Sequence, residues 1–201
     1  MKIRHILITF LGILTLAWAW DVFVLNPMPG DAIWVARKQG IYLTGVWAMG
    51  LMSLTMILAT RPVWLEPVLG GMDRIYHLHK WAGILAVSAG ITHWLLELGG
   101  DTLRSLIGRA VNKPPRVAVL DILQSSRGLA EDVGEWAIYA LIATLLITLW
   151  KAFPYKSWRI LHRVMPVLYL ALVFHSVALT PAAWPWCCRL SGSGRRSGCR
   201  P

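Results

Sequence analysis

Five long apolar segments dominate this sequence and leave few ways in which the chain can fold. A helix needs about 20 apolar residues to cross the hydrocarbon core of a membrane. We expect transmembrane helices at about residues 5–25, 41–60, 79–97, 135–151 and 161–185. The fold class that this pattern predicts is an all-α integral membrane helix bundle, with membrane lipid as its surrounding partner.

The composition favours a membrane protein over a soluble or nucleic-acid-binding one. Hydrophobic residues make up 56% of the 201 residues, against about 45–50% in soluble domains. Several of the twelve Trp lie at the ends of apolar segments, where interfacial aromatic belts form. The formal charge is +10, but the basic residues flank the apolar segments. The charge therefore indicates membrane orientation, and no nucleic acid is expected as a partner.

The loop charges predict which side of the membrane each end of a helix faces. With the N-terminus in the cytoplasm, the inner loops hold nine Lys and Arg against two acids, and the outer loops hold seven against eight. This agrees with the positive-inside rule and makes the third and fifth helices parallel. We expect a bacterial inner membrane protein. The first segment has an alternative as a signal peptide cleaved near Ala17-Trp18-Ala19, which leaves this orientation unchanged.

Two stretches outside the apolar segments carry no recognisable chemistry. Residues 97–135 are expected as a long outer loop, in which residues 101–111 form a short amphipathic surface helix. The domain over residues 1–186 is followed by residues 187–201, which are expected as a disordered or aberrant basic tail. The three cysteines fall in this tail without a C-x-x-C or C-x-x-C-H motif. Zinc and thioredoxin-like motifs and thioether-linked haem are thereby excluded.

Four histidines on the third and fifth helices are the candidate binding residues. His93 and His175 lie inside apolar stretches, where an ionisable side chain is costly and marks a functional site. His79 and His162 lie at the cytoplasmic ends of the same helices. The separations of 14 and 13 residues correspond to about 21 and 19.5 Å of helix. Two parallel helices would thus place His79 opposite His162 and His93 opposite His175, so that each pair can ligate one haem iron.

Two alternatives exist for these histidines. A single histidine in a membrane can be a hydrogen-bonding partner between helices. A non-haem metal site needs ligands that converge to about 2 Å from one point, which histidines four turns apart on one helix cannot do. Small residues on the third helix leave room for a macrocycle, although ordinary tight helix packing also favours them. These residues are Ala82, Gly83, Ala86, Ser88, Ala89 and Gly90.

Helical phase distinguishes the candidates from their neighbours and reveals one misfit. His77 points about 160° away from the face of His93, so it is expected at the interface. An ideal helix places His162 and His175 about 140° apart. Pro166 removes one backbone hydrogen bond and permits a kink or an overwound turn that corrects this phase.

At these histidines the chain resembles the ferric reductase-like transmembrane domain, the haem-bearing membrane part of ferric reductases and NADPH oxidases. The likeness covers about residues 40–180 and rests on the segments from His79 to His93 and from Leu161 to His175. It implies two stacked b-type haems that transfer electrons from the cytoplasmic side to the outside. The implied iron ligands are His79, His93, His162 and His175.

The resemblance also has limits that bear on cofactors and partners. The sixth helix usual in the family, and its flavin and nicotinamide domain, have no matching segment in this sequence, so the chain is expected to be truncated relative to the family. Flavin and NAD(P)H would then act only through a missing domain or a partner. No catalytic residue is predicted, because iron ligated by two histidines has no open position and relays electrons. Arg74, Lys80, Arg159 and Arg163 lie where inner-haem propionates would emerge, or serve only as positive-inside flanks.

Two other functions remain open at the level of sequence. The chain could be the haem membrane subunit of a separate reductase of the methionine sulfoxide reductase type. It would then receive electrons from a flavoprotein reductase or from quinol. It could also be an inactive truncated remnant that inserts into the membrane without doing chemistry.

Overall fold

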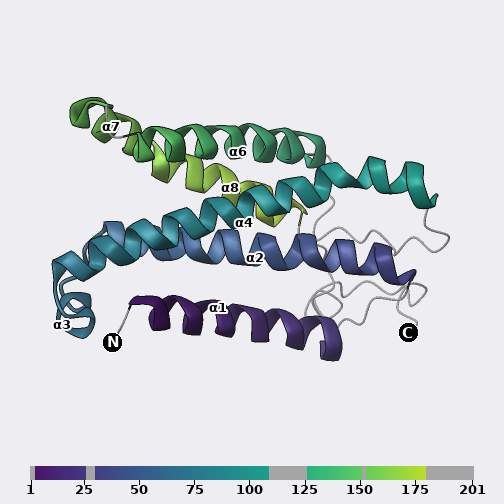
Figure 1. Ribbon diagram of the computed structural model, residues 1–201, viewed down its shortest axis with the longest axis horizontal. Coiled ribbons are helices and arrows are strands. Elements are labelled where there is room, and N and C mark those ends of the chain that lie inside the picture. Colours follow the sequence, from purple (N-terminus) through teal and green to yellow (C-terminus); the bar gives the residue numbers. More distant parts are fainter. Residues whose placement is uncertain (1–2, 26–29, 109–125, 151–152, 180–201) are drawn as a thin grey trace, which may run out of the picture.

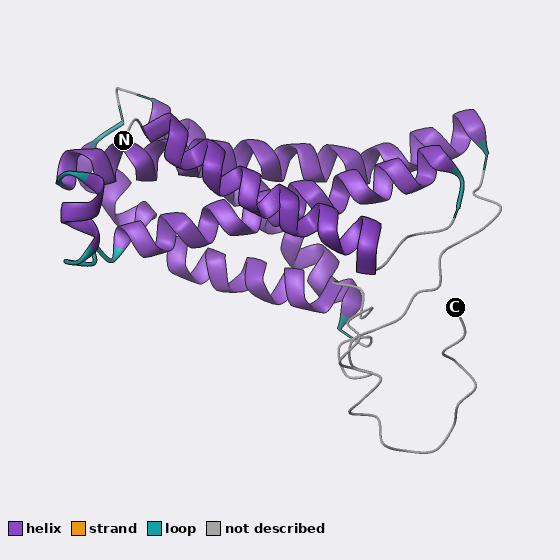
Figure 2. Cartoon of the chain, turned by 90° about the horizontal axis from the view of Figure 1, so that it is seen from below, coloured by secondary structure: helices purple, strands orange, loops and turns teal. Residues whose placement is uncertain are grey.

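The computed structural model describes residues 3–25, 30–108, 126–150 and 153–179. Its regular elements within these ranges are all helical, as Figure 2 shows. Five helices in the described part are long and apolar enough to cross a membrane. The predicted all-α membrane bundle is confirmed. Its elements are α1 (Ile3–Trp20) with a π-helical turn η1 (Asp21–Leu25), α2 (Ala32–Ala59), α3 (Leu65–Leu69), α4 (Met72–Ile107), α6 (Arg127–Leu149), α7 (Tyr155–His162) and α8 (Met165–Leu179).

The long helices alternate in direction (Figure 1). α1, α4 and α8 run one way, and α2 and α6 run the other way. α4 and α8 are therefore parallel, as predicted for the third and fifth apolar segments. The most extensive packing joins α2 to α4 and α6 to α8, and smaller contacts join α4 to α6 and α1 to α2.

Small side chains on α4 let the neighbouring helices approach it closely. Ala82 and Ala86 are buried, as are Leu51 and Leu58 on the facing side of α2. Lipid is as apolar as these side chains, so close van der Waals packing holds the helices together here. The small residues predicted to leave space thus contribute in part to ordinary helix contact.

α4 is much longer than the predicted helix at 79–97. It has 36 residues, about 54 Å of helix, which is more than the hydrocarbon core of about 30 Å requires. Residues 101–107 continue this helix, so the predicted separate surface helix and much of the predicted loop are wrong. The apolar pattern marks the membrane-embedded part of a helix, and the helix itself continues where its charged side chains meet water. Asp101 and Arg104, for example, form an exposed ion pair of 2.6 Å.

The other predicted boundaries shift for similar reasons. α2 begins nine residues before the predicted start and includes Arg37, whose guanidinium is bonded to α4. α6 begins at Arg127, which pairs with Glu131 at 3.1 Å.

The sharp turn between α3 and α4 uses Gly70 and Gly71, with φ of 83° and 113°, which glycine adopts readily. The predicted basic tail at 187–201 lies outside the described residues.

Candidate functional site

Two pairs of histidines lie at two levels of the bundle. His79 of α4 lies beside His162 at the end of α7, with ring centroids 5.9 Å apart and ring planes at 72°. Further along α4, His93 lies beside His175 of α8, with centroids 6.4 Å apart and planes at 77°. We call these the inner pair and the outer pair. The structure brings together the histidines that the spacing predicts as partners, and metal ligation by them stays a prediction.

The last membrane helix is broken between its two histidines, His162 and His175. α7 ends at His162 and α8 begins at Met165. The two residues between them donate their amides to carbonyls three residues back, at 3.2 and 3.1 Å, which is a tighter turn than the α-helix. Pro166 has no N–H to donate to the His162 carbonyl. The structure thus has an overwound turn next to Pro166, as predicted.

Both rings of the outer pair are held by backbone carbonyls of other helices. Nδ1–H of His93 donates to the Ile41 carbonyl of α2 at 2.8 Å. Nδ1–H of His175 donates to the Ala130 carbonyl of α6 at 2.7 Å. A carbonyl oxygen only accepts, so Nδ1 of each ring carries the hydrogen and Nε2 keeps its lone pair. This is the state in which a histidine binds a metal, with its other nitrogen fixed by a hydrogen bond.

Glycines lie against both rings of the outer pair. A Cβ added at Gly45 of α2 would lie 3.2 Å from Nδ1 of His93. A Cβ added at Gly134 of α6 would overlap the His175 ring. Sequence reasoning missed both glycines, because glycine is common in membrane helices and does not by itself mark a site.

The inner pair is held less uniformly. Nδ1–H of His79 donates to the Thr55 carbonyl at 3.2 Å. Nδ1 of His162 is buried and has no hydrogen-bond partner among the residues that the structure describes. Instead, the Trp158 ring stacks on the His162 ring, with centroids 4.9 Å apart and planes at 18°. One inner histidine is therefore fixed by a hydrogen bond and the other by ring stacking.

The stack on His162 continues to the surface. Tyr155 stacks on Trp158, with ring centroids 5.6 Å apart and planes at 25°, and Tyr155 is 68% exposed. The Trp158 indole Nε1–H donates to Oγ1 of Thr148 at 3.0 Å, which fixes its orientation. Two aromatic rings, those of Trp158 and Tyr155, thus connect the inner pair to one end of the bundle.

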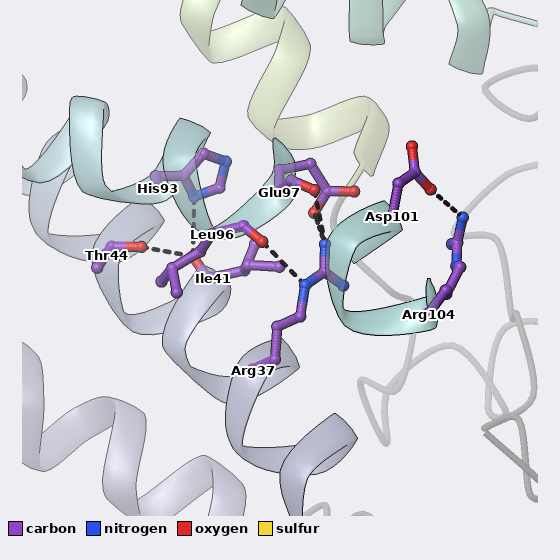
Figure 3. A network of polar contacts seen from close by, with 8 residues as sticks. All are labelled: Arg37, Ile41, Thr44, His93, Leu96, Glu97, Asp101 and Arg104. Atoms are coloured by element: carbon purple, nitrogen blue, oxygen red, sulfur yellow. Dashed lines mark hydrogen bonds and ion pairs between the residues drawn. The ribbon is translucent and has the colours of Figure 1, made fainter. Parts of the chain in front are cut away.

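A polar network joins α2 and α4 beyond the outer pair (Figure 3). Arg37 of α2 donates to the carbonyls of Leu96 and Glu97 in α4, both at 2.8 Å. Its guanidinium also lies 3.5 Å from the Glu97 carboxylate. His93 donates in the opposite sense, from α4 to Ile41 of α2. The two helices are therefore tied by reciprocal hydrogen bonds close to the outer pair.

The residues at both levels fit a haem held between two histidines. Two imidazole nitrogens that bind one metal ion from opposite sides, each about 2 Å away, place their ring centroids roughly 6 Å apart. The separations of 5.9 and 6.4 Å match this distance. In the described part of the chain, the backbones of α4 and α8 do not pack closely against each other. No three His, Cys, Asp or Glu side chains gather there as a possible metal site either, so the donor set at each level is two imidazoles.

The other predicted residues lie outside the two pairs. His77 and His5 are exposed, in agreement with their expected place at the interface or the flank. The four basic residues expected near the inner haem are also exposed, at the end of the bundle that carries the inner pair. They are Arg74, Lys80, Arg159 and Arg163.

Comparison with known proteins supports one family. Residues 44–173 match the family described as the ferric reductase like transmembrane component, and this segment covers more than half of the 201 residues. It contains His79, His93 and His162 and ends two residues before His175. No curated protein and no solved structure matches the chain.

Proposed function

Because the chain belongs to the ferric reductase like transmembrane component family, and is thus an integral membrane component of an oxidoreductase, we propose that it carries electrons across the membrane through two b-type haems. His79 and His162 are the proposed ligands of the inner haem. His93 and His175 are the proposed ligands of the outer haem. The observation that carries this proposal is the presence of two histidine pairs whose centroids lie 5.9 and 6.4 Å apart, one between α4 and the end of α7 and the other between α4 and α8.

The hydrogen bonds of the histidines support ligation through Nε2. In three of the four rings, Nδ1–H donates to a backbone carbonyl, which leaves Nε2 for the metal. These carbonyls belong to Ile41, Thr55 and Ala130. Such bonds fix the tautomer and the orientation of a ligating ring. A histidine that only joined two helices would have no need of a second histidine at this distance on a third element.

Bound haem would supply a one-electron redox couple at each of the two levels. The chain's own residues would hold and orient the two histidines at each level, through the carbonyls of Ile41, Thr55 and Ala130 and the ring of Trp158. With two histidines per iron there is no open position for a substrate, so the proposed role is electron relay.

We propose that electrons enter at the end of the inner pair and leave at the end of the outer pair. The distribution of charge supports a cytoplasmic N-terminus, with nine Lys and Arg against two acids in the loops on that side. The stack of Tyr155, Trp158 and His162 offers a route from the surface at this end. The proposed donor is a flavoprotein reductase or quinol.

The pyridine haemochrome assay tests the haem content. We expect two non-covalent b-type haems per chain when the protein is produced with ample haem and purified in detergent. The double variant His79→Ala/His93→Ala should bind none, because it retains only one histidine at each level. Wild-type protein without haem would exclude the proposed function.

A further inference from the structure

The outer histidines are held by the same arrangement on two different helices. His93 donates to the carbonyl of Ile41, and its ring lies against Gly45, four residues later in α2. His175 donates to the carbonyl of Ala130, and its ring lies against Gly134, four residues later in α6. In each case a histidine from one helix binds a carbonyl of a second helix and rests on the glycine one turn beyond it.

Helix geometry explains why the glycine occupies this position. The carbonyl of residue i accepts the amide of residue i+4, and side chains tilt toward the helix N-terminus. A side chain at i+4 therefore leans over the carbonyl at i and hinders a second donor. Glycine leaves that carbonyl open, so the imidazole can approach to 2.7–2.8 Å.

Two other sites in the same bundle support this reading. Arg37 donates to the carbonyl of Leu96 at 2.8 Å and lies against Gly100, again four residues later. His79 donates to the carbonyl of Thr55, where the residue four positions later is Ala59, and its bond is longer, at 3.2 Å. Three of the four bonds of 2.7–2.8 Å have glycine at this position, and the fourth, from Arg37 to the Glu97 carbonyl, has Asp101. The long bond has alanine.

We infer that Gly45 and Gly134 are positioning residues for the outer haem and that, through its ligands, they keep its reduction potential low. This inference rests on the proposed function. A short bond from Nδ1–H makes a ligating imidazole more basic, and a more basic ligand favours ferric iron over ferrous iron. Among the residues that the structure describes, both outer ligands have such a bond, whereas only one inner ligand has a bond of this kind, and it is longer.

The test compares alanine variants of these glycines with alanine variants of glycines elsewhere. A Cβ at Gly134 would overlap the His175 ring, so Gly134→Ala should lower the haem-to-protein ratio from two to one and leave the inner haem. A Cβ at Gly45 would require only a small shift of His93. Gly45→Ala should therefore keep both haems, raise the outer potential and leave the inner potential unchanged. Gly99→Ala and Gly128→Ala are controls, because nothing lies within 4 Å of a Cβ at either position.

Potentiometric titration followed by haem absorbance gives the readout, and the His175→Ala protein, which should lack the outer haem, assigns the two components. An unchanged outer potential in Gly45→Ala, or the same shift in the control variants, would overturn the inference. Loss of both haems from Gly134→Ala would mark a folding defect. The outer potential of Gly45→Ala would then decide whether the inference holds. Wild-type protein without haem would be a failure of the proposed function instead, and would be seen before any variant is made.

Discussion

The inner and outer histidine pairs are similar in ring separation but differ in what holds the rings. In the outer pair, each ring donates a short hydrogen bond to a backbone carbonyl and lies against a glycine. In the inner pair, His79 has a longer bond, and His162 is stacked on Trp158 without a hydrogen-bond partner for Nδ1 among the described residues. The outer pair is fixed by the backbones of α2 and α6. In the inner pair the α2 backbone holds His79, and the Trp158 side chain stacks on His162.

This difference separates the placement of two paired histidines from the contacts that hold each ring. Two histidines lie at a similar distance in different surroundings at the two levels, so the identity of the paired residues alone does not set the properties of each level. Hydrogen bonding around the ligands tunes a metal site. At the outer level, backbone carbonyls hold both histidine rings. At the inner level, stacked rings of Trp158 and Tyr155 connect His162 to the surface.

The largest expected effect comes from removing one histidine of either pair. His79→Ala should lose the inner haem and keep the outer one, because His93 and His175 are untouched. His175→Ala should do the reverse. The pyridine haemochrome assay and a reduced-minus-oxidised spectrum measure both outcomes.

His77→Ala is the matched control for His79→Ala, since His77 is exposed and two residues away. It should keep two haems. A His77→Ala protein with one haem, together with a His79→Ala protein with two, would contradict the assignment of the inner pair.

A second prediction concerns the outer level only. Arg37→Leu removes two hydrogen bonds from a charged donor to α4, each of a type that contributes about 1.5–3 kcal/mol. We expect the outer haem to be lost at lower temperature than in wild type, while the inner haem changes little. Thermal melts followed at the absorbance of each haem measure this.

Arg104→Leu serves as its control, because the ion pair with Asp101 has side chains that are 57% and 88% exposed and is worth about 0.5 kcal/mol or less. Equal effects of Arg37→Leu on both haems would show that the network stabilises the whole bundle and has no special relation to the outer level.

A third prediction concerns the inner level only. Trp158→Leu removes the stack on His162, and aromatic pairs of this kind contribute about 0.5–1.5 kcal/mol. The inner haem should therefore pass to apomyoglobin about two to ten times faster than in wild type, with no change at the outer haem. Trp64→Leu is the control, because Trp64 is 68% exposed and lies outside the stack. Faster release of the outer haem in Trp158→Leu would contradict the distinction between the levels.

The smallest expected effect should be shared by both levels. Tyr169 of α8 and Ser53 of α2 form a hydrogen bond of 2.8 Å between the two histidine levels. Tyr169→Phe removes it, and hydrogen bonds between membrane helices contribute about 0.6 kcal/mol on average. Both haems should be lost at a slightly and equally lower temperature. An effect on one haem alone would show that this bond belongs to one level.

The sequence predicts the two histidine pairs better than it predicts what holds them. Spacing on parallel helices indicates the pairing of His79 with His162 and of His93 with His175, and Pro166 explains the one misfit in phase. The carbonyls of Ile41 and Ala130 could not be predicted, because any residue type has a carbonyl and its partner depends on the register between helices. The extent of α4 was underestimated because hydropathy reports contact with lipid, whereas the helix continues through charged residues.

The length of α4 has a consequence for how the protein responds to the membrane around it. One uninterrupted helix carries both His79 and His93, so their separation along the axis is fixed at about 21 Å. Helices adapt to thicker or thinner bilayers mainly by tilting. When α4 tilts, His79 and His93 move as one rigid unit and their separation is unchanged. Tunnelling between two redox centres slows steeply with distance. For the electron relay proposed above, a rigid spacer of this kind would make the transfer step insensitive to lipid composition.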